Sequence, residues 1–202
     1  MTYTFAEVAA PEGAPLLVLL HGTGGDENDL LPLGRQFLDG ARIVSPRGDV
    51  SEGGALRFFK RTGMGVYDMG DLARATQKLA GFIGEQVAAH KPRSVAALGL
   101  SNGANLLASL LFAHPELVGK AVLMHPLIPF VPPAQPGLAG KPVLITAGRQ
   151  DPIGPAASTQ ALVEYFGAQG AQPQIIWHNG GHEVRQVELL AARDFLAAEG
   201  TA

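Results

Sequence analysis

The stretch "GLSNG" at residues 99–103 places Ser101 between two glycines. A serine hydroxyl can attack a carbonyl carbon when a neighbouring base removes its proton. The G-x-S-x-G spacing gives the chain room for the sharp turn that exposes such a serine. The chain has 26 glycines in 202 residues, so chance alone gives roughly 0.1 such motifs around its six serines. The surroundings of Ser101 must therefore decide its role.

Ser101 follows the apolar stretch 94–100, a predicted strand, and precedes a predicted helix over 102–113. A turn between the two would lift the hydroxyl above the end of the sheet, where open α/β sheets bind ligands. It would also point the positive end of the helix at the reacting group. The alternative is that Ser101 only caps the helix. We interpret Ser101 as a catalytic nucleophile.

A catalytic serine needs a base that is held by an acid, in the chain order Ser, Asp or Glu, then His. Asp151, in "AGRQDPIG", is the one aspartate between Ser101 and the late histidines. Pro152 favours an extended backbone at Asp151, which keeps the carboxylate in the loop after a strand. The alternative is a simple Asp-Pro turn. The position favours Asp151 as the acid of a triad.

Two late histidines, His178 and His182, are candidates for the base. His178 ends the predicted strand 172–179, whereas His182 follows two glycines in "NGGHEV". A tight loop before a helix is the better place from which to swing an imidazole over the edge of the sheet. We therefore predict His182 as the base and His178 as a partly buried residue at the end of the strand.

The oxyanion formed during acyl transfer needs N–H donors that are already in place. The stretch "LLHGTGGDEND" follows an early apolar strand, and its glycines let the backbone curve around the site. We expect donors from the backbone N–H groups of Thr23 and Asn102, with His21 packed beneath the loop. The stretch lacks the lysine of a phosphate-binding loop and the third glycine of a dinucleotide-binding motif.

Apolar stretches and helical patterns alternate along the chain, which predicts a mainly parallel sheet flanked by helices. No repeat or linker divides it, so we predict a single domain over 1–202. The predicted strands cover 15–22, 41–46, 94–100, 120–126, 141–148 and 172–179, and the predicted helices cover 26–40, 68–90, 102–113, 157–170 and 184–200.

The composition excludes several classes of function. The net charge is −3 with no block of like charge, so no nucleic-acid partner is expected. There is no cysteine, which excludes disulfides, a thiolate nucleophile and cysteine zinc sites. The longest apolar run, 16–20, is too short to span a bilayer, and no secretory signal is visible, so a cytoplasmic protein is expected. We expect no metal site, because two glycines separate His178 from His182 and prevent a shared helical face. We also expect no cofactor, because a serine nucleophile with its base needs none.

Two segments should shape the substrate pocket. The proline-rich segment between the strands near residues 126 and 141 is too short for a helical cap domain. The excursion 47–67 concentrates aromatic residues, and we expect Phe58 or Phe59 to line the acyl site. The alternative is that both pack the excursion onto the core. His125 follows a strand and is a further candidate for the pocket, with a core or rim position as its alternative.

Taken together, "LLHGTGGDENDLLPLG", "SPRG", "RFF", "GLSNGAN", "MHPLIP", "AGRQDP" and "GGHEV" resemble the phospholipase/carboxylesterase family of α/β-hydrolases, especially its small bacterial esterases. The resemblance covers about residues 15–195. It implies an α/β-hydrolase fold with a Ser-Asp-His triad at Ser101, Asp151 and His182. It also implies hydrolysis of small carboxylic esters and often a homodimer. Dienelactone hydrolases are related in fold but use a cysteine nucleophile, from which Ser101 departs.

The sequence leaves three functions open. The first is a serine carboxylesterase that acts through an acyl-enzyme, with no cofactor. The second keeps the same triad but acts on a thioester or a lysophospholipid. The third is a non-catalytic ligand-binding member of the fold, because a fold does not fix a function.

Overall fold

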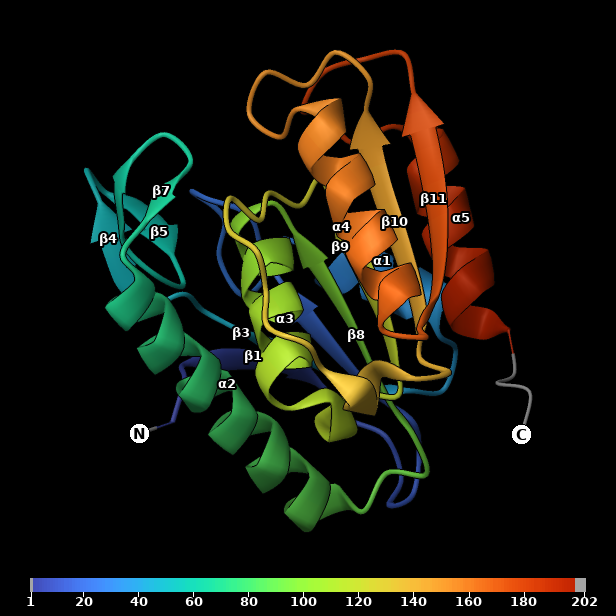
Figure 1. The fold of residues 1–202 in the computed structure, drawn as a ribbon. Helices are drawn as coiled ribbons and strands as arrows, with labels where there is room; N and C mark the ends of the chain where they lie inside the picture. The colour runs from blue at the N-terminus through green and yellow to red at the C-terminus, as the bar shows by residue number, and fades with distance from the viewer. Residues whose placement is uncertain (1, 199–202) are drawn as a thin grey trace.

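A computed structural model describes residues 2–198, and the predicted helix over 184–200 ends in two residues that lie outside this range. Seven strands form the central sheet, in the order β1-β3-β2-β8-β9-β10-β11 (Figure 1). The first strand pairs antiparallel to its neighbour and the other pairs are parallel. The strands are β1 (Phe5–Val8), β2 (Leu16–Leu20), β3 (Arg42–Pro46), β8 (Val95–Leu100), β9 (Lys120–Met124), β10 (Pro142–Gly148) and β11 (Gln172–His178).

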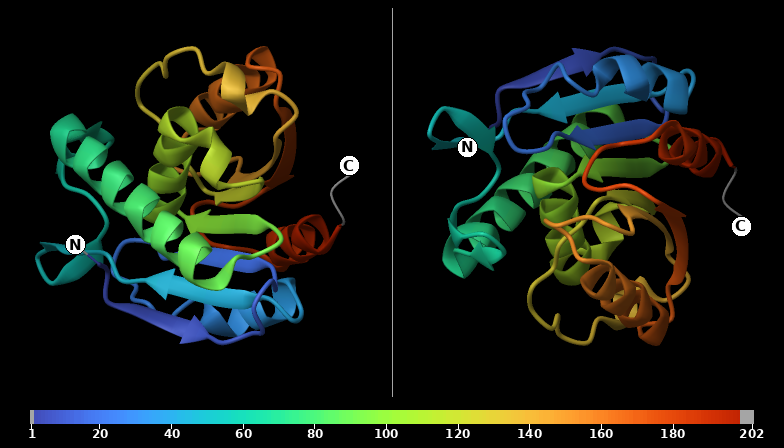
Figure 2. Two further views of the ribbon diagram at one scale, coloured as in Figure 1. Left: turned by 90° about the horizontal axis from the view of Figure 1, so that it is seen from below. Right: turned by 90° about the horizontal axis from the view of Figure 1, so that it is seen from above.

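Helices cover both faces of the sheet (Figure 2). One face carries α2 (Met69–His90), α3 (Asn102–Ala113) and α4 (Ala156–Ala168), and the other carries α1 (Leu31–Phe37) and α5 (Gln186–Ala197). Alternate residues of each strand point to opposite faces. Leu16, Val18 and Leu20 of β2 therefore belong to the core beneath α2 and α3, whereas Leu17 and Leu19 belong to the core beneath α1 and α5. This confirms the predicted parallel sheet between helices.

The excursion 47–67 forms two small antiparallel hairpins beside the main sheet (Figure 1). The first pairs β4 (Val50–Glu52) with β5 (Ala55–Arg57), and the second pairs β6 (Arg61–Gly63) with β7 (Val66–Tyr67). Between β9 and β10 the chain forms a single short 3₁₀ turn, η2 (Pro136–Leu138). A second 3₁₀ turn, η1 (Pro115–Leu117), follows α3. No cap domain covers the sheet in the described residues, in agreement with the sequence.

The structure differs from the sequence prediction in three main places. The helix expected over 26–40 is shorter, because turns occupy the acidic stretch before α1. Strand β1 was not predicted, since its half-buried residues at the edge of the sheet carry no continuous apolar run. The excursion contains short strands that lack a period long enough to detect. None of the described helices is long and apolar enough to cross a membrane.

Candidate active site

Ser101 lies in a sharp turn between β8 and α3. Its backbone has φ +50° and ψ −110°, an unusual conformation for a residue other than glycine. A side chain at Gly99 would overlap the backbone of Gly103, and one at Gly103 would overlap the carbonyl of Leu20. Both glycines are therefore needed for the close approach of strand and helix. The spacing that drew attention to Ser101 thus has a direct steric cause.

The Ser101 hydroxyl does not cap the helix that follows it. The side chain makes no capping hydrogen bond to the start of α3. Its Oγ lies instead 2.9 Å from Nε2 of His182. The structure therefore contradicts the alternative that Ser101 only caps the helix.

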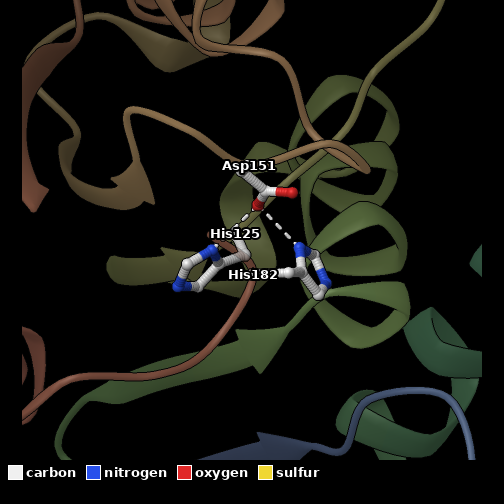
Figure 3. A group of neighbouring side chains, drawn as sticks. All are labelled: His125, Asp151 and His182. Carbon is white, nitrogen blue, oxygen red and sulfur yellow. Dashed lines mark hydrogen bonds and ion pairs between the residues drawn. The ribbon is translucent and has the colours of Figure 1, made fainter. Parts of the chain in front are cut away.

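Asp151 and His182 reach Ser101 from two loops at the carboxyl ends of β10 and β11. Oδ2 of Asp151 lies 2.6 Å from Nδ1 of His182, in a contact drawn in Figure 3. The Asp151 side chain is fully buried, while that of His182 is 22% exposed. The structure brings the three predicted residues together in the order serine, imidazole, carboxylate.

The environment of Asp151 favours its ionised form. Burial alone would raise the pKa of this carboxyl, but hydrogen bonds from the backbone of Gly154, from His182, from His125 and from the backbone of Ile153 lower it. Oδ1 accepts both backbone N–H groups, at 2.8 and 3.0 Å. The carboxylate therefore remains charged and holds a fixed orientation toward His182.

The loop after β2 lies beside Ser101, and Gly22 and Thr23 line the same cavity as Ser101 and Asn102. His21 fixes this loop from below. Its Nδ1 donates to the carbonyl of Gly22 at 2.7 Å, and its Nε2 accepts from the backbone N–H of Gly48 at 2.9 Å. Burial lowers the pKa of His21, in keeping with a neutral ring. His21 therefore supports the loop, as the sequence suggested.

The cavity above Ser101 has a volume of about 500 Å³. Among residues 2–198, no carboxylate lines it, while the guanidinium groups of Arg57 and Arg61 do. Arg57 is almost fully buried and donates to the hydroxyl of Thr23 at 2.7 Å. The apolar lining comes from Met64, Leu100, Leu127, Ile153 and Val184.

The expectation that Phe58 or Phe59 lines the pocket is wrong. Both side chains are fully buried and belong to the core beneath α2 and α3. Phe58 stacks on His21, and Phe59 packs against Tyr67. The excursion turns these rings inward, because their apolar surface is better buried than exposed. The wall that faces the cavity is formed by Arg57, Arg61, Met64, Gly65 and Tyr67 instead.

The expectation for His125 has a different outcome, because this side chain does line the cavity, although it is only 1% exposed.

Substitutions in the core and in the cavity wall should therefore affect different properties of the protein. Replacing Phe59 by leucine should destabilise the fold by about 1–2 kcal/mol without changing the preference for acyl chain length. Replacing Leu127, which lines the cavity, by alanine should shift that preference toward bulkier acyl groups. Thermal melting and rates on a series of esters measure the two effects. A changed preference in Phe59→Leu with none in Leu127→Ala would contradict this assignment.

Sequence reasoning missed part of the pocket wall. The side-chain amide of Asn105 on α3 donates to the hydroxyl of Tyr67 at 2.7 Å, and its oxygen accepts from the backbone N–H of Leu127 at 2.7 Å. The Tyr67 hydroxyl in turn donates to the carbonyl of Leu127 at 2.6 Å. Asn105 thus joins the excursion to the loop after β9. Its position one turn after Ser101 was the available signal.

Sequence reasoning also missed Glu188. This side chain lies on α5, is fully buried and contacts His125 and His178. Glu188 shares a helical face with the buried residues Ala192 and Phe195, so a carboxylate interrupts an apolar stripe. That interruption was visible in the sequence.

In the part of the chain that the structure describes, two overlapping groups contain side chains of the kinds that ligate metals. They are His125 with Asp151 and His182, and His125 with His178 and Glu188. The ring nitrogens and carboxylate oxygens of these groups lie opposite one another at 2.6–3.2 Å. A metal ion would have to displace these contacts. We therefore assign the groups as ion-pair and hydrogen-bond partners.

A family model described as the dienelactone hydrolase family matches residues 71–183, more than half of the chain. The chain belongs to the dienelactone hydrolase family. The match confirms the resemblance to α/β-hydrolase esterases, with serine in place of the cysteine expected of a dienelactone hydrolase.

This dienelactone hydrolase family member is similar to a hydrolase of Bacillus subtilis and to two solved structures. It is 42% identical over 182 residues to the putative hydrolase MhqD of Bacillus subtilis, covering 89% of this chain and 91% of the relative. A solved protein of unknown function from Agrobacterium tumefaciens, Atu2452, is 54% identical with a TM-score of 0.90, over 96% of this chain and 95% of that one. The Bacillus cereus carboxylesterase is 37% identical with a TM-score of 0.90, over 96% and 93%. The chain is a hydrolase of the dienelactone hydrolase/carboxylesterase type.

Proposed function

We propose that this protein is a serine carboxylesterase that hydrolyses small carboxylic esters through an acyl-enzyme. The observation that carries the proposal is the continuous contact from Ser101 Oγ to His182 Nε2, at 2.9 Å, and from His182 Nδ1 to Asp151 Oδ2, at 2.6 Å. In this geometry the imidazole can accept the hydroxyl proton while the carboxylate stabilises the imidazolium that forms.

The reaction follows from these contacts in two stages. Ser101 attacks the ester carbonyl and His182 takes its proton, which gives a tetrahedral oxyanion. We assign the backbone N–H groups of Thr23 and Asn102 as the donors to that oxyanion. His182 then returns the proton to the departing alcohol. Water, deprotonated by His182, attacks the acyl-enzyme, and His182 returns this proton to the Ser101 oxygen as the bond to the acyl group breaks and the carboxylic acid leaves.

The cavity supports a small substrate. A volume of about 500 Å³ lies in the usual range for small-molecule sites. Apolar side chains, among them Leu127 and Ile153, offer contacts for an acyl chain of modest length. The similarity to the carboxylesterase of Bacillus cereus, at 37% identity, points in the same direction.

A substrate panel tests the proposal. The protein should hydrolyse short-chain aryl esters with a kcat/KM at least about tenfold above that for acyl-thioesters and lysophospholipids. A preference for thioesters or lysophospholipids would replace the proposal by the corresponding alternative. If no substrate turns over and Ser101 does not react with a fluorophosphonate, the non-catalytic alternative holds.

A further inference from the structure

His125 lies behind the triad, with both ring nitrogens facing carboxylates. Its Nδ1 is 3.1 Å from Oδ2 of Asp151, the oxygen that His182 also contacts (Figure 3). Its Nε2 is 3.0 Å from Oε1 of Glu188, an ion pair that is not aligned as a hydrogen bond. The side chains of His125, Asp151 and Glu188 are all fully buried.

This placement determines the protonation of the ring. A neutral imidazole has one N–H and one lone pair. In a neutral His125 the lone pair would face a buried carboxylate oxygen, which is repulsive. A doubly protonated ring presents an N–H to each side and supplies the counter-charge that two buried carboxylates require.

Both carboxylates are themselves held in the ionised form. Each oxygen of Asp151 accepts hydrogen bonds, from two backbone N–H groups on one side and from imidazoles on the other. Glu188 accepts from the Thr146 hydroxyl at 2.6 Å and from the backbone N–H of Arg185 at 2.7 Å. Neither carboxyl is arranged to carry the proton in place of His125.

His178 differs from His125, although both contact Glu188. Nδ1 of His178 accepts from the backbone N–H of Gly180 at 3.0 Å, so this nitrogen carries no proton. Its Nε2, 3.2 Å from Glu188, must then carry the single proton of a neutral ring. The buried cluster around His125 therefore contains two negative charges, one positive charge on His125, and the neutral ring of His178.

We propose that His125 is a protonated positioning residue that lies as a counter-ion between Asp151 and Glu188 and, through Asp151, sets the pH at which His182 acts as a base. The proposal rests on the proposed function only for its effect on His182. The positive charge of His125 offsets part of the negative charge that faces His182. It therefore limits how strongly the cluster holds a proton on His182 in the resting enzyme.

The direction of the pKa shifts agrees with this arrangement. Burial alone would lower the pKa of His125, but its contacts with the carboxylates of Glu188 and Asp151 raise it above its ordinary value. Burial alone would raise the pKa of Glu188, but contacts from His125 and Thr146 lower it. A histidine with a raised pKa stabilises the fold fully below its unfolded pKa, and this contribution is lost as pH rises through the folded pKa.

Nitrogen NMR of the imidazole rings tests the protonation states directly. In the wild-type protein at pH 8, the resonances of His125 should be those of a doubly protonated ring, and those of His178 should be those of a neutral ring protonated at Nε2. The variants His125→Asn and His178→Asn assign the signals by their loss. A neutral His125 at pH 8 would overturn the proposal, and this result does not depend on any catalytic activity.

The acid limb of the kcat/KM profile tests the effect on catalysis. In His125→Asn the side-chain amide still reaches Asp151 and asparagine tolerates positive φ, but the positive charge is lost. The cluster then stabilises protonated His182, and the acid limb should move to higher pH by about one unit. His178→Asn is the matched control and should not move the limb upward, because it removes a neutral ring.

A double variant separates charge from packing. In His125→Asn with Glu188→Gln, the cluster regains the net charge of the wild type, so the acid limb should return to its wild-type position. The melting temperature should fall by about 6–12 °C in His125→Asn and recover in the double variant. An acid limb that is unmoved in His125→Asn, or no recovery in the double variant, would overturn the proposal. If the wild type proves inactive, the melting temperatures and NMR still test the charge arrangement.

Discussion

Replacing Ser101 by alanine should reduce kcat for ester hydrolysis by about 10⁴- to 10⁶-fold. The variant loses the atom that forms the acyl-enzyme, and the remaining groups can only bind the ester and its oxyanion. The fold should persist, because the hydroxyl makes no capping bond to α3. Initial rates, with a circular dichroism spectrum for each protein, measure both effects.

Ser109→Ala is the matched control for this variant. Ser109 lies on the same helix and bonds to Thr76 at 2.8 Å, but it does not line the cavity. Its replacement should leave kcat within about twofold of the wild type. A Ser101→Ala protein that retains more than about 1% of the activity would remove Ser101 from the nucleophile position.

Asp151→Asn should lower kcat by about 10⁴-fold. Oδ1 of Asp151 accepts two backbone N–H groups, so the oxygen of asparagine keeps that side. The NH₂ group then faces His182, whose Nδ1 must accept instead of donate. The proton of the neutral ring moves to Nε2, which faces Ser101 and can no longer take the hydroxyl proton.

The same change at an exposed carboxylate controls for the loss of one negative charge. Asp194 on α5 lies at the surface and contacts Arg193. Asp194→Asn should retain full activity. Equal activities of Asp151→Asn and the wild type would show that the carboxylate does not orient the base.

The sequence was sufficient to predict those residues of the site whose positions follow from local steric requirements or from the order of the strands. The turn at Ser101 needs glycines at 99 and 103, and this requirement is visible as a motif. Asp151 follows the buried strand β10 and His182 follows the edge strand β11, which runs parallel to it, so their loops must meet at the same end of the sheet. Chain order and strand ends therefore predicted the three residues that the structure brings together.

Contacts between distant segments were not predictable in this way. Phe58 and Phe59 lie in an excursion without periodicity, and only the tertiary fold decides whether such rings face a cavity or the core. The contact between Glu188 and His125 joins a helix to the end of a strand 63 residues earlier in the chain. The spacing of residues along the chain cannot reveal such pairs. A carboxylate on an apolar helical face does indicate that it has a buried partner.

Reaction with a fluorophosphonate tests the central claim most directly, namely that His182 makes the Ser101 hydroxyl nucleophilic. Intact-mass and peptide mass spectrometry should find one phosphonyl group on the wild-type protein, attached to Ser101. Ser101→Ala should not be labelled, and His182→Asn should be labelled at least about 10³-fold more slowly. Labelling of another residue, or equally fast labelling without the His182 imidazole, would contradict the account.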